Sequence, residues 1–172
     1  RFLMQNSKSY ATALLLKQLK ELNNNSDSQF SVGLNDENIF DWEICFEGPQ
    51  NSLYEGGIYR ATLKFPENFP ENPPVMKFKT QMWHPNIYPD GTVCISILHP
   101  PGEDAMNSQE SATERWRPVL GVEQILISVL SMLNAPNIDS PANVDAGLQF
   151  RDDSEGYKKK VRQLARKSAE EI

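Results

Sequence analysis

Apolar residues recur near the start of the chain at the spacing of an amphipathic helix. Over residues 9–24 they fall at every third or fourth position, and charged residues occupy the remaining surface. This pattern predicts a helix with one buried face, formed by Ala11, Leu15, Leu19 and Leu22. The turn formers NNNSDS then end it.

Four short stretches follow in which apolar and polar residues alternate. They lie at 30–35, 40–48, 58–65 and 75–80, and turn formers separate them. A period of two is typical of a strand with one buried face. Several prolines precede the last stretch and exclude a helix there. Because the connections are short, we predict an antiparallel meander.

The last part of the chain is helical in pattern. Residues 122–133 carry a broad apolar stripe that extends to Ile127 and Met132, which predicts a buried central helix. A short helix near 141–149 and a helix with a basic surface near 154–170 follow. A helix, a run of strands and then helices are typical of an α+β fold.

Residues 83–120 show no sustained periodicity and are rich in Pro, Asn, Gly and Asp. Long irregular segments in compact domains are usually functional or disordered, so we expect a functional loop region. No internal repeat and no second domain are apparent. We therefore expect residues 1–172 to form a single domain.

Composition and charge reduce the number of function classes that fit the chain. The formal net charge is −6, which argues against nucleic-acid binding because that affinity depends on Lys and Arg. No apolar run reaches the length of a membrane span, and the N-terminal stretch does not resemble a secretory signal. Two cysteines are too few for a disulfide framework, which favours a reducing compartment, the cytoplasm or the nucleus.

Cys94 stands inside the irregular segment, in WHPNIYPDGTVCISIL, with an acidic run after it. Two interpretations stay open from the residues alone, a buried apolar side chain and an exposed functional thiol. The acids would raise the pKa of the thiol. Cys45 lies in an alternating stretch, opposite the face of Trp42 and Ile44, and we expect it to be structural.

Two common cysteine chemistries do not fit. A protease needs a histidine base, and neither His84 nor His99 lies in a protease signature. The same histidines with the two cysteines lack the paired spacing of a zinc site, so we expect no metal. We expect His84 to bond the backbone. Asn86 either donates to a developing oxyanion or holds a turn.

The stretch around Cys94 resembles the active-site signature of the ubiquitin-conjugating enzymes. Asn86 of the HPN tripeptide precedes the cysteine by eight positions. FDWEICFEGPQNSLYEGGIYRATLKFPENFPENPP and RWRPVLGVEQILISVLSMLNAPNIDSPAN are also similar to that family, so the resemblance covers about 160 residues. It implies the family's α+β fold, with an N-terminal helix, a four-stranded antiparallel meander, an active-site loop, a central helix and C-terminal helices.

The resemblance also implies a mechanism. Cys94 would accept ubiquitin from the activating enzyme as a thioester and pass it to a lysine. Asn86 would stabilise the oxyanion or hold the active-site loop, and His84 would support the site. The activating enzyme uses the ATP, so we expect no cofactor here. The other implied partners are a ubiquitin ligase of the RING type and protein substrates.

The chain departs from the commonest family pattern near the cysteine. Ser96 and Ser140 stand where many members have acidic residues. Trp116 lies 22 positions after Cys94, much farther than in many members. The intervening insert is acidic and resembles the subgroup of cell-division-cycle and endoplasmic-reticulum-associated degradation enzymes, which builds polyubiquitin chains with ligases.

We hypothesise that Glu103 and Asp104 of this insert replace the missing acids. They would lie over the Cys94 cleft and position the acceptor. The alternative is a mobile, solvated loop. Two rival functions also remain, a non-catalytic relative and an enzyme of another ubiquitin-like modifier.

The family meets ligases through its first helix and two loops. The matching positions in this chain are Lys17, Pro70, Glu71, Trp116, Pro118 and Val119. A bulky apolar residue is common where Glu71 stands, which hints at a different set of partners. Ser31 matches the position where some members bind a second ubiquitin.

Overall fold

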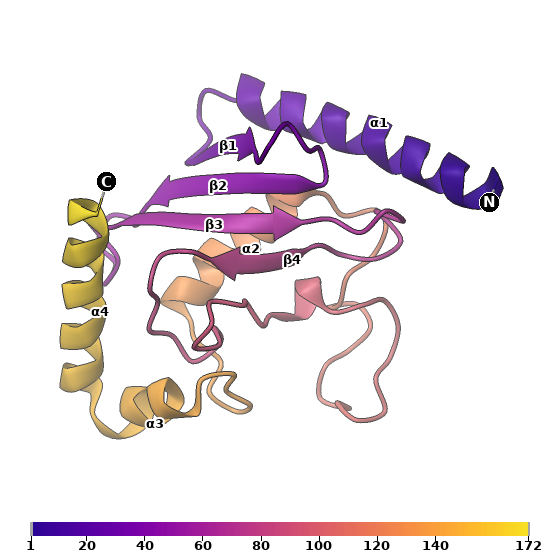
Figure 1. Cartoon of the computed structure of the whole chain (residues 1–172). Helices are drawn as coiled ribbons and strands as arrows, with labels where there is room; N and C mark the ends of the chain where they lie inside the picture. The colour runs from indigo at the N-terminus through magenta and orange to yellow at the C-terminus, as the bar shows by residue number, and fades with distance from the viewer. Residues whose placement is uncertain (1, 172) are drawn as a thin grey trace.

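The computed structural model describes residues 2–171. Its four strands form one antiparallel sheet in the order β1-β2-β3-β4 (Figure 1), which confirms the predicted meander. Each strand pairs with the next one along the chain because the connections are short. The strands are β1 (Phe30–Leu34), β2 (Asp41–Glu47), β3 (Ile58–Lys64) and β4 (Val75–Phe78).

One face of the sheet is buried. In β2, Trp42 and Ile44 are at most 1% exposed, and Glu43 between them points outward. Behind this sheet in the view of Figure 1 lies α2 (Val122–Asn134), the predicted central helix. Its Ile125 and Leu126 belong to the same core as the strand residues. Apolar burial on this face is the main driving force for the fold.

Two details of the predicted helices are wrong. Ile127 is 54% exposed, because the turn of α2 directs it away from the sheet, whereas Met132 is buried as predicted. The first helix, α1 (Phe2–Asn24), begins earlier than residue 9. Its first residues are apolar but exposed, so the apolar pattern could not indicate where the helix begins.

Side chains hold the start of α2 against α1. Oε1 of Gln18 accepts a hydrogen bond from the backbone N–H of Val122 at 2.8 Å. Oε1 of Gln124 accepts one from the N–H of Gly121 at 2.9 Å. The first N–H groups of a helix have no backbone partner within the helix, so these contacts cap α2, and the Gln18 bond ties its start to α1.

The chain ends in two helices, α3 (Val144–Asp152) and α4 (Ser154–Glu170). Asn143 caps α3 by accepting from the N–H of Ala146 at 3.0 Å, so this helix starts slightly later than predicted. Helix α4 stands at one end of the strands (Figure 1), where Ser168 accepts from the N–H of Ile58 at 3.0 Å. Within residues 2–171, no helix is long and apolar enough to cross a membrane.

Candidate active site

A tight turn brings the HPN tripeptide beside Cys94. The backbone N–H of Cys94 donates to the carbonyl of Asn86 at 2.9 Å, and that of Tyr88 donates to Thr92 at 2.9 Å. Gly91 lies in the turn with a φ of +97°, and a Cβ there would collide with a backbone carbonyl of β4. Only glycine adopts this positive φ easily and has no Cβ to meet the carbonyl. The turn therefore fixes the sulfur relative to the Asn86 amide.

His84 is a fully buried structural histidine. Its Nε2 lies 2.8 Å from the carbonyl of Met132, and its Nδ1 accepts from the N–H of Asn86 at 2.9 Å. Burial lowers the pKa of His84 to about 4, against a smaller opposing effect of the Met132 bond. The neutral imidazole therefore joins the HPN turn to the end of α2, which agrees with a backbone-bonded histidine.

Asn86 joins the turn to the loop after α2. Its Nδ2 donates to the carbonyl of Asn137 at 2.8 Å, and its Oδ1 accepts from the N–H of the same residue at 2.8 Å. The backbone N–H of Asn143 also donates to the carbonyl of Pro85, at 3.0 Å. The side chain of Asn86 thus acts as a two-point clamp on the loop.

Cys94 is half-buried in the wall of a pocket. The HPN turn, the loop after α2 and the insert that follows Cys94 form the other walls, and Asn86, Ser96 and Ser140 are among the lining residues. Within residues 2–171, no group of three or more His, Cys, Asp or Glu side chains could hold a metal ion.

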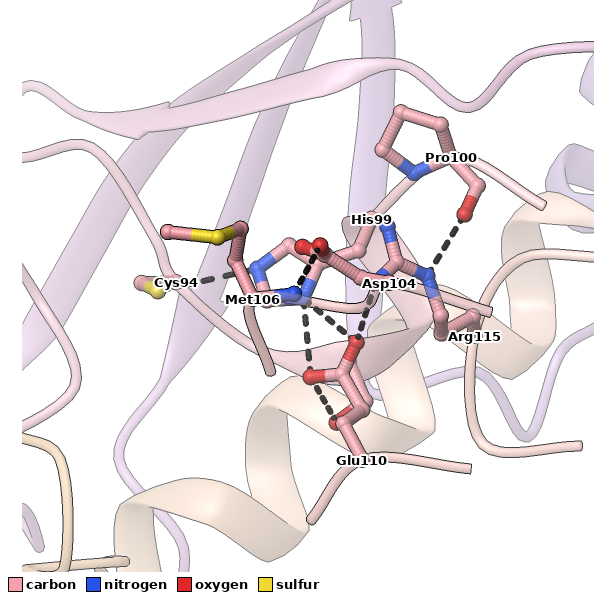
Figure 2. A network of polar contacts seen from close by, with 8 residues as sticks. Cys94, His99, Pro100, Asp104, Met106, Glu110 and Arg115 are labelled. Atoms are coloured by element: carbon pink, nitrogen blue, oxygen red, sulfur yellow. Dashed lines mark hydrogen bonds and ion pairs between the residues drawn. The ribbon is translucent and has the colours of Figure 1, made fainter. Parts of the chain in front are cut away.

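Glu110 of the insert is the main polar contact at this pocket. It accepts from Oγ of Ser96 at 2.9 Å and lies 2.9 Å from Nδ1 of His99. Arg115 pairs with it at 3.2 Å and also donates from Nε to the carbonyl of Pro100 at 2.7 Å. Figure 2 shows this network beside Cys94. The network folds the insert back onto the active-site segment.

The same network shifts the pKa of the thiol. Nε2 of His99 lies 3.7 Å from Sγ of Cys94. This hydrogen bond is the largest influence on the pKa of Cys94 and lowers it, although burial and Glu110 oppose the shift. The nearby acid Glu110 does raise this pKa, as expected, but the hydrogen bond from His99 outweighs it, so the pKa of Cys94 is lowered overall.

Comparisons with a family model and with known proteins agree with this geometry. A family model described as "Ubiquitin-conjugating enzyme" matches residues 14–165. The chain belongs to the ubiquitin-conjugating enzyme family. Ubiquitin-conjugating enzyme E2 15 of Schizosaccharomyces pombe is 54% identical over 165 residues, which cover 95% of this chain and 98% of that protein.

Two further relatives extend the match. Ubiquitin-conjugating enzyme E2 7 of Arabidopsis thaliana is 52% identical over 163 residues, 94% of this chain and 98% of that protein. Ubiquitin-conjugating enzyme E2 G2 of Bos taurus is 49% identical over 155 residues, which cover 90% of this chain and 93% of that protein. These relatives are named for ubiquitin, which argues against the rival interpretation of another modifier.

A ubiquitin-conjugating enzyme is a transferase that holds ubiquitin as a thioester and passes it on. Its partners are ubiquitin, the ubiquitin-activating enzyme and ubiquitin ligases. The reaction needs a thiol that another protein can reach and that leaves readily once acylated. A half-buried cysteine with a lowered pKa satisfies both needs, since a thiol of lower pKa leaves faster.

The structure places the predicted acids of the insert differently. Glu103 is exposed, and neither Glu103 nor Asp104 lines the enzyme's pocket, so the expectation that they lie over the Cys94 cleft is wrong. Asp104 instead contacts Arg115 at 3.7 Å. The acids of the insert that line the pocket are Glu110 and Glu114.

His99 was not among the predicted site residues of this enzyme. A short 3-10 turn, η1 (Ser96–Leu98), returns the chain toward the cysteine, and the N–H of His99 donates to the carbonyl of Ser96 at 2.9 Å. This turn carries no periodic pattern in sequence. A histidine five positions after Cys94 was the available signal, but its geometry depends on the turn.

Most positions that match ligase contacts lie around one pocket between α1 and the start of α2. Its lining includes Lys17, Pro70, Pro118 and Val119. Trp116 does not fit this role, because it is 0% exposed and its Nε1 donates to the carbonyl of Pro70 at 2.7 Å. The side chain of Trp116 therefore supports the loop of Pro70 from the core and is not exposed for a direct contact.

Proposed function

We propose that Cys94 is the thiol that takes ubiquitin from the activating enzyme and passes it to a lysine of a substrate or of another ubiquitin. The observation that carries the proposal is the position of Cys94, half-buried in a pocket that it shares with Asn86, Ser96 and Ser140. The other thiol, Cys45, lies in β2 on the face opposite the core.

We propose that Asn86 chiefly holds the active-site loop. Both atoms of its amide group are engaged with the backbone of Asn137, and the side chain is buried. An Asn amide has two donor protons, so the second Nδ2–H remains for a developing oxyanion. His84 supports the same clamp from below, through its bond to the N–H of Asn86.

The chain also fits the subgroup with a long acidic insert, which builds polyubiquitin chains for protein degradation. Ser96 and Ser140 both line the pocket in place of acids, and Glu110 and Glu114 of the insert line it with them. A carboxylate near the thioester attracts the lysine ammonium and can draw off its proton. The insert would thus orient the acceptor lysine.

Glu103 and Asp104 act less directly in this proposal. Asp104 contacts Arg115 at 3.7 Å and accepts from the N–H of Met106 at 2.9 Å, so it holds the folded insert. Glu103 is exposed and is available to an acceptor ubiquitin.

The ligase is proposed to be of the RING type and to bind the pocket between α1 and α2. Val119 is 84% exposed there, and an exposed apolar residue of this kind suits a protein contact. Lys17, Pro70 and Pro118 line the same pocket, and Glu71 is exposed. This acid favours a ligase with a basic residue at that point.

Ser31 lies on the open face of the sheet, where a second ubiquitin would bind.

The proposed catalytic domain comprises residues 1–172 as one unit, since helices and strands share one core cluster. Both cysteines are free, which suits a reducing compartment, the cytoplasm or the nucleus.

A charging assay tests the role of Cys94. The protein is mixed with ubiquitin, activating enzyme and ATP, and the products are separated with and without reductant. We expect a reductant-sensitive adduct that Cys94→Ala abolishes and Cys45→Ala retains. An adduct that persists in Cys94→Ala would refute the assignment.

Deletion of residues 102–112 tests the insert. We expect loading of ubiquitin to survive and chain formation to fall. Unchanged chain formation and unchanged transfer to acceptors would show that the insert is only a solvated loop.

A further inference from the structure

His99 lies between the thiol of Cys94 and a carboxylate. Its Nε2 is 3.7 Å from Sγ of Cys94, and its Nδ1 is 2.9 Å from Oε1 and from Oε2 of Glu110. Figure 2 shows the three side chains joined by these contacts. An imidazolium has a donor on each ring nitrogen, so it can donate to the carboxylate and direct its other N–H at the sulfur.

Backbone and side-chain contacts fix this arrangement. The N–H of His99 donates to the carbonyl of Ser96 at 2.9 Å, and its carbonyl accepts from the N–H of Trp116 at 3.0 Å. Glu110 accepts from Ser96 and pairs with Arg115 at 3.2 Å, and its side chain is 9% exposed. Ion pairs with little exposure are screened less than surface pairs. The imidazole is therefore held beside the sulfur from both sides.

We propose that His99 is a further catalytic residue of this enzyme, which stabilises the Cys94 thiolate in both half-reactions, and that Glu110 is the positioning residue that holds the imidazole. The inference rests on the proposed role of Cys94 as the residue that carries ubiquitin. It assigns a task to a histidine and a glutamate that the resemblance to the family did not identify.

The two half-reactions both pass through a thiolate at the same sulfur. In loading, the Cys94 sulfur bonds to the carbonyl carbon of ubiquitin, and the thiolate of the activating enzyme leaves. In transfer, the lysine nitrogen bonds to that carbon and loses its proton through a carboxylate of the insert to solvent, and the carbon–sulfur bond breaks with its electron pair on Sγ. A cationic N–H of His99 stabilises the sulfur as nucleophile in the first step and as leaving group in the second.

The charges around the thiol support this assignment. The hydrogen bond from His99 lowers the pKa of Cys94 most, and Tyr88 lowers it further, while burial and Glu110 raise it. The contacts of His99 with Cys94 and Glu110 raise the pKa of the imidazole to about 9, against the effect of burial. The imidazole is therefore charged at neutral pH, as the proposal requires.

The first test measures alkylation of Cys94 by iodoacetamide as a function of pH, read by mass spectrometry. Cys45 in the same molecule is the internal reference. In His99→Gln a neutral side chain replaces the cation, so we expect the Cys94 midpoint to move to higher pH and its rate at pH 7 to fall about tenfold. Discharge of loaded ubiquitin to free lysine slows by a similar factor. If His99→Gln only loosened the structure, the alkylation of Cys45 would change as well, and the pH midpoint of Cys94 would not move by itself.

The second test follows the His99 ring by NMR titration. Glu110→Gln removes the carboxylate, so we expect the pKa of His99 to fall from about 9. Glu67→Gln is the matched control, since it breaks an exposed ion pair with Lys8 and should leave that pKa unchanged. Cys94→Ser should also lower it. The serine variant leaves His99 intact, so it tests the pair even where His99→Gln is unstable.

The outcomes separate the inference from the proposed function. An unshifted Cys94 midpoint in His99→Gln, with ubiquitin still loaded on Cys94, would overturn the inference alone. An unchanged pKa of His99 in Glu110→Gln would overturn the positioning role. Reductant-sensitive loading of Cys94→Ala would overturn the proposed function itself.

Discussion

Protonation of His84 should release the contact that joins the HPN turn to α2. In the folded protein its Nδ1 accepts from the N–H of Asn86, and its Nε2 bonds the carbonyl of Met132. A second proton on the ring would leave Nδ1 with no lone pair for Asn86 and would place a charge in a site with 0% exposure. Acid should therefore destabilise this part of the protein first.

The size of this loss of stability follows from the pKa of His84. Burial lowers the pKa of His84 from 6.5 to about 4, so the unfolded chain binds a proton between these values and the folded protein does not. The stabilisation is fully present above pH 6.5 and is lost as the pH falls toward 4. With about 1.4 kcal/mol for each pKa unit, the loss is about 2 kcal/mol by pH 5 and about 3 kcal/mol by pH 4.

Urea unfolding of the wild type and of His84→Gln at pH 7, 6 and 5 measures this loss. The glutamine keeps a donor for the Met132 carbonyl but does not titrate, so the variant is less stable at pH 7 and has a shallower pH dependence than the wild type. We expect the gap in the free energy of unfolding to shrink by about 2 kcal/mol between pH 7 and 5. Equal pH dependence in both proteins, or an NMR titration of His84 near pH 6.5, would refute the reasoning.

Three further predictions concern the same region. Asn86→Ala removes two hydrogen bonds to the loop after α2, so the free energy of unfolding in urea should fall by about 2 kcal/mol; a value like that of the wild type would contradict the clamp. Gly91→Ala should lower the free energy of unfolding by at least about 1 kcal/mol, because Gly91 has a positive φ and a Cβ there would meet a strand carbonyl. Gly33→Ala is the control: the space at its Cβ is open, so the melting temperature should change little. Arg115→Gln should speed hydrogen exchange across residues 100–114, and unchanged protection there would show that other contacts hold the insert.

Local patterns in the sequence predicted much of the fold. The four strands lie within a few residues of their predicted positions, and α2 begins at Val122 and ends at Asn134. Both depend on a repeat of apolar residues over a short stretch, which directly encodes the buried face. Helix α1 began earlier than predicted because its first residues are exposed and carry no such repeat.

The sequence also indicated Cys94 and Asn86, because their spacing in the HPN segment is itself a motif. It could not indicate the partner of Asn86, since Asn137 lies 51 positions away and is brought there by the packing of α2. The burial of Trp116 has the same origin, because its Nε1 reaches the carbonyl of Pro70 across 46 positions.

The apolar periodicity and the short motifs of the sequence by themselves determined the fold class, the acidic insert and the thiol. Only the tertiary structure decided which acid contacts the histidine beside that thiol. Glu103, Asp104 and Glu110 are similar side chains in one aperiodic segment, and no local pattern distinguishes them. Arg115 is buried where the insert returns to the core and pairs with Glu110. The contacts that single out Glu110 are those with Ser96 and His99, 14 and 11 positions before it, and they form only when the insert folds back onto the active-site segment.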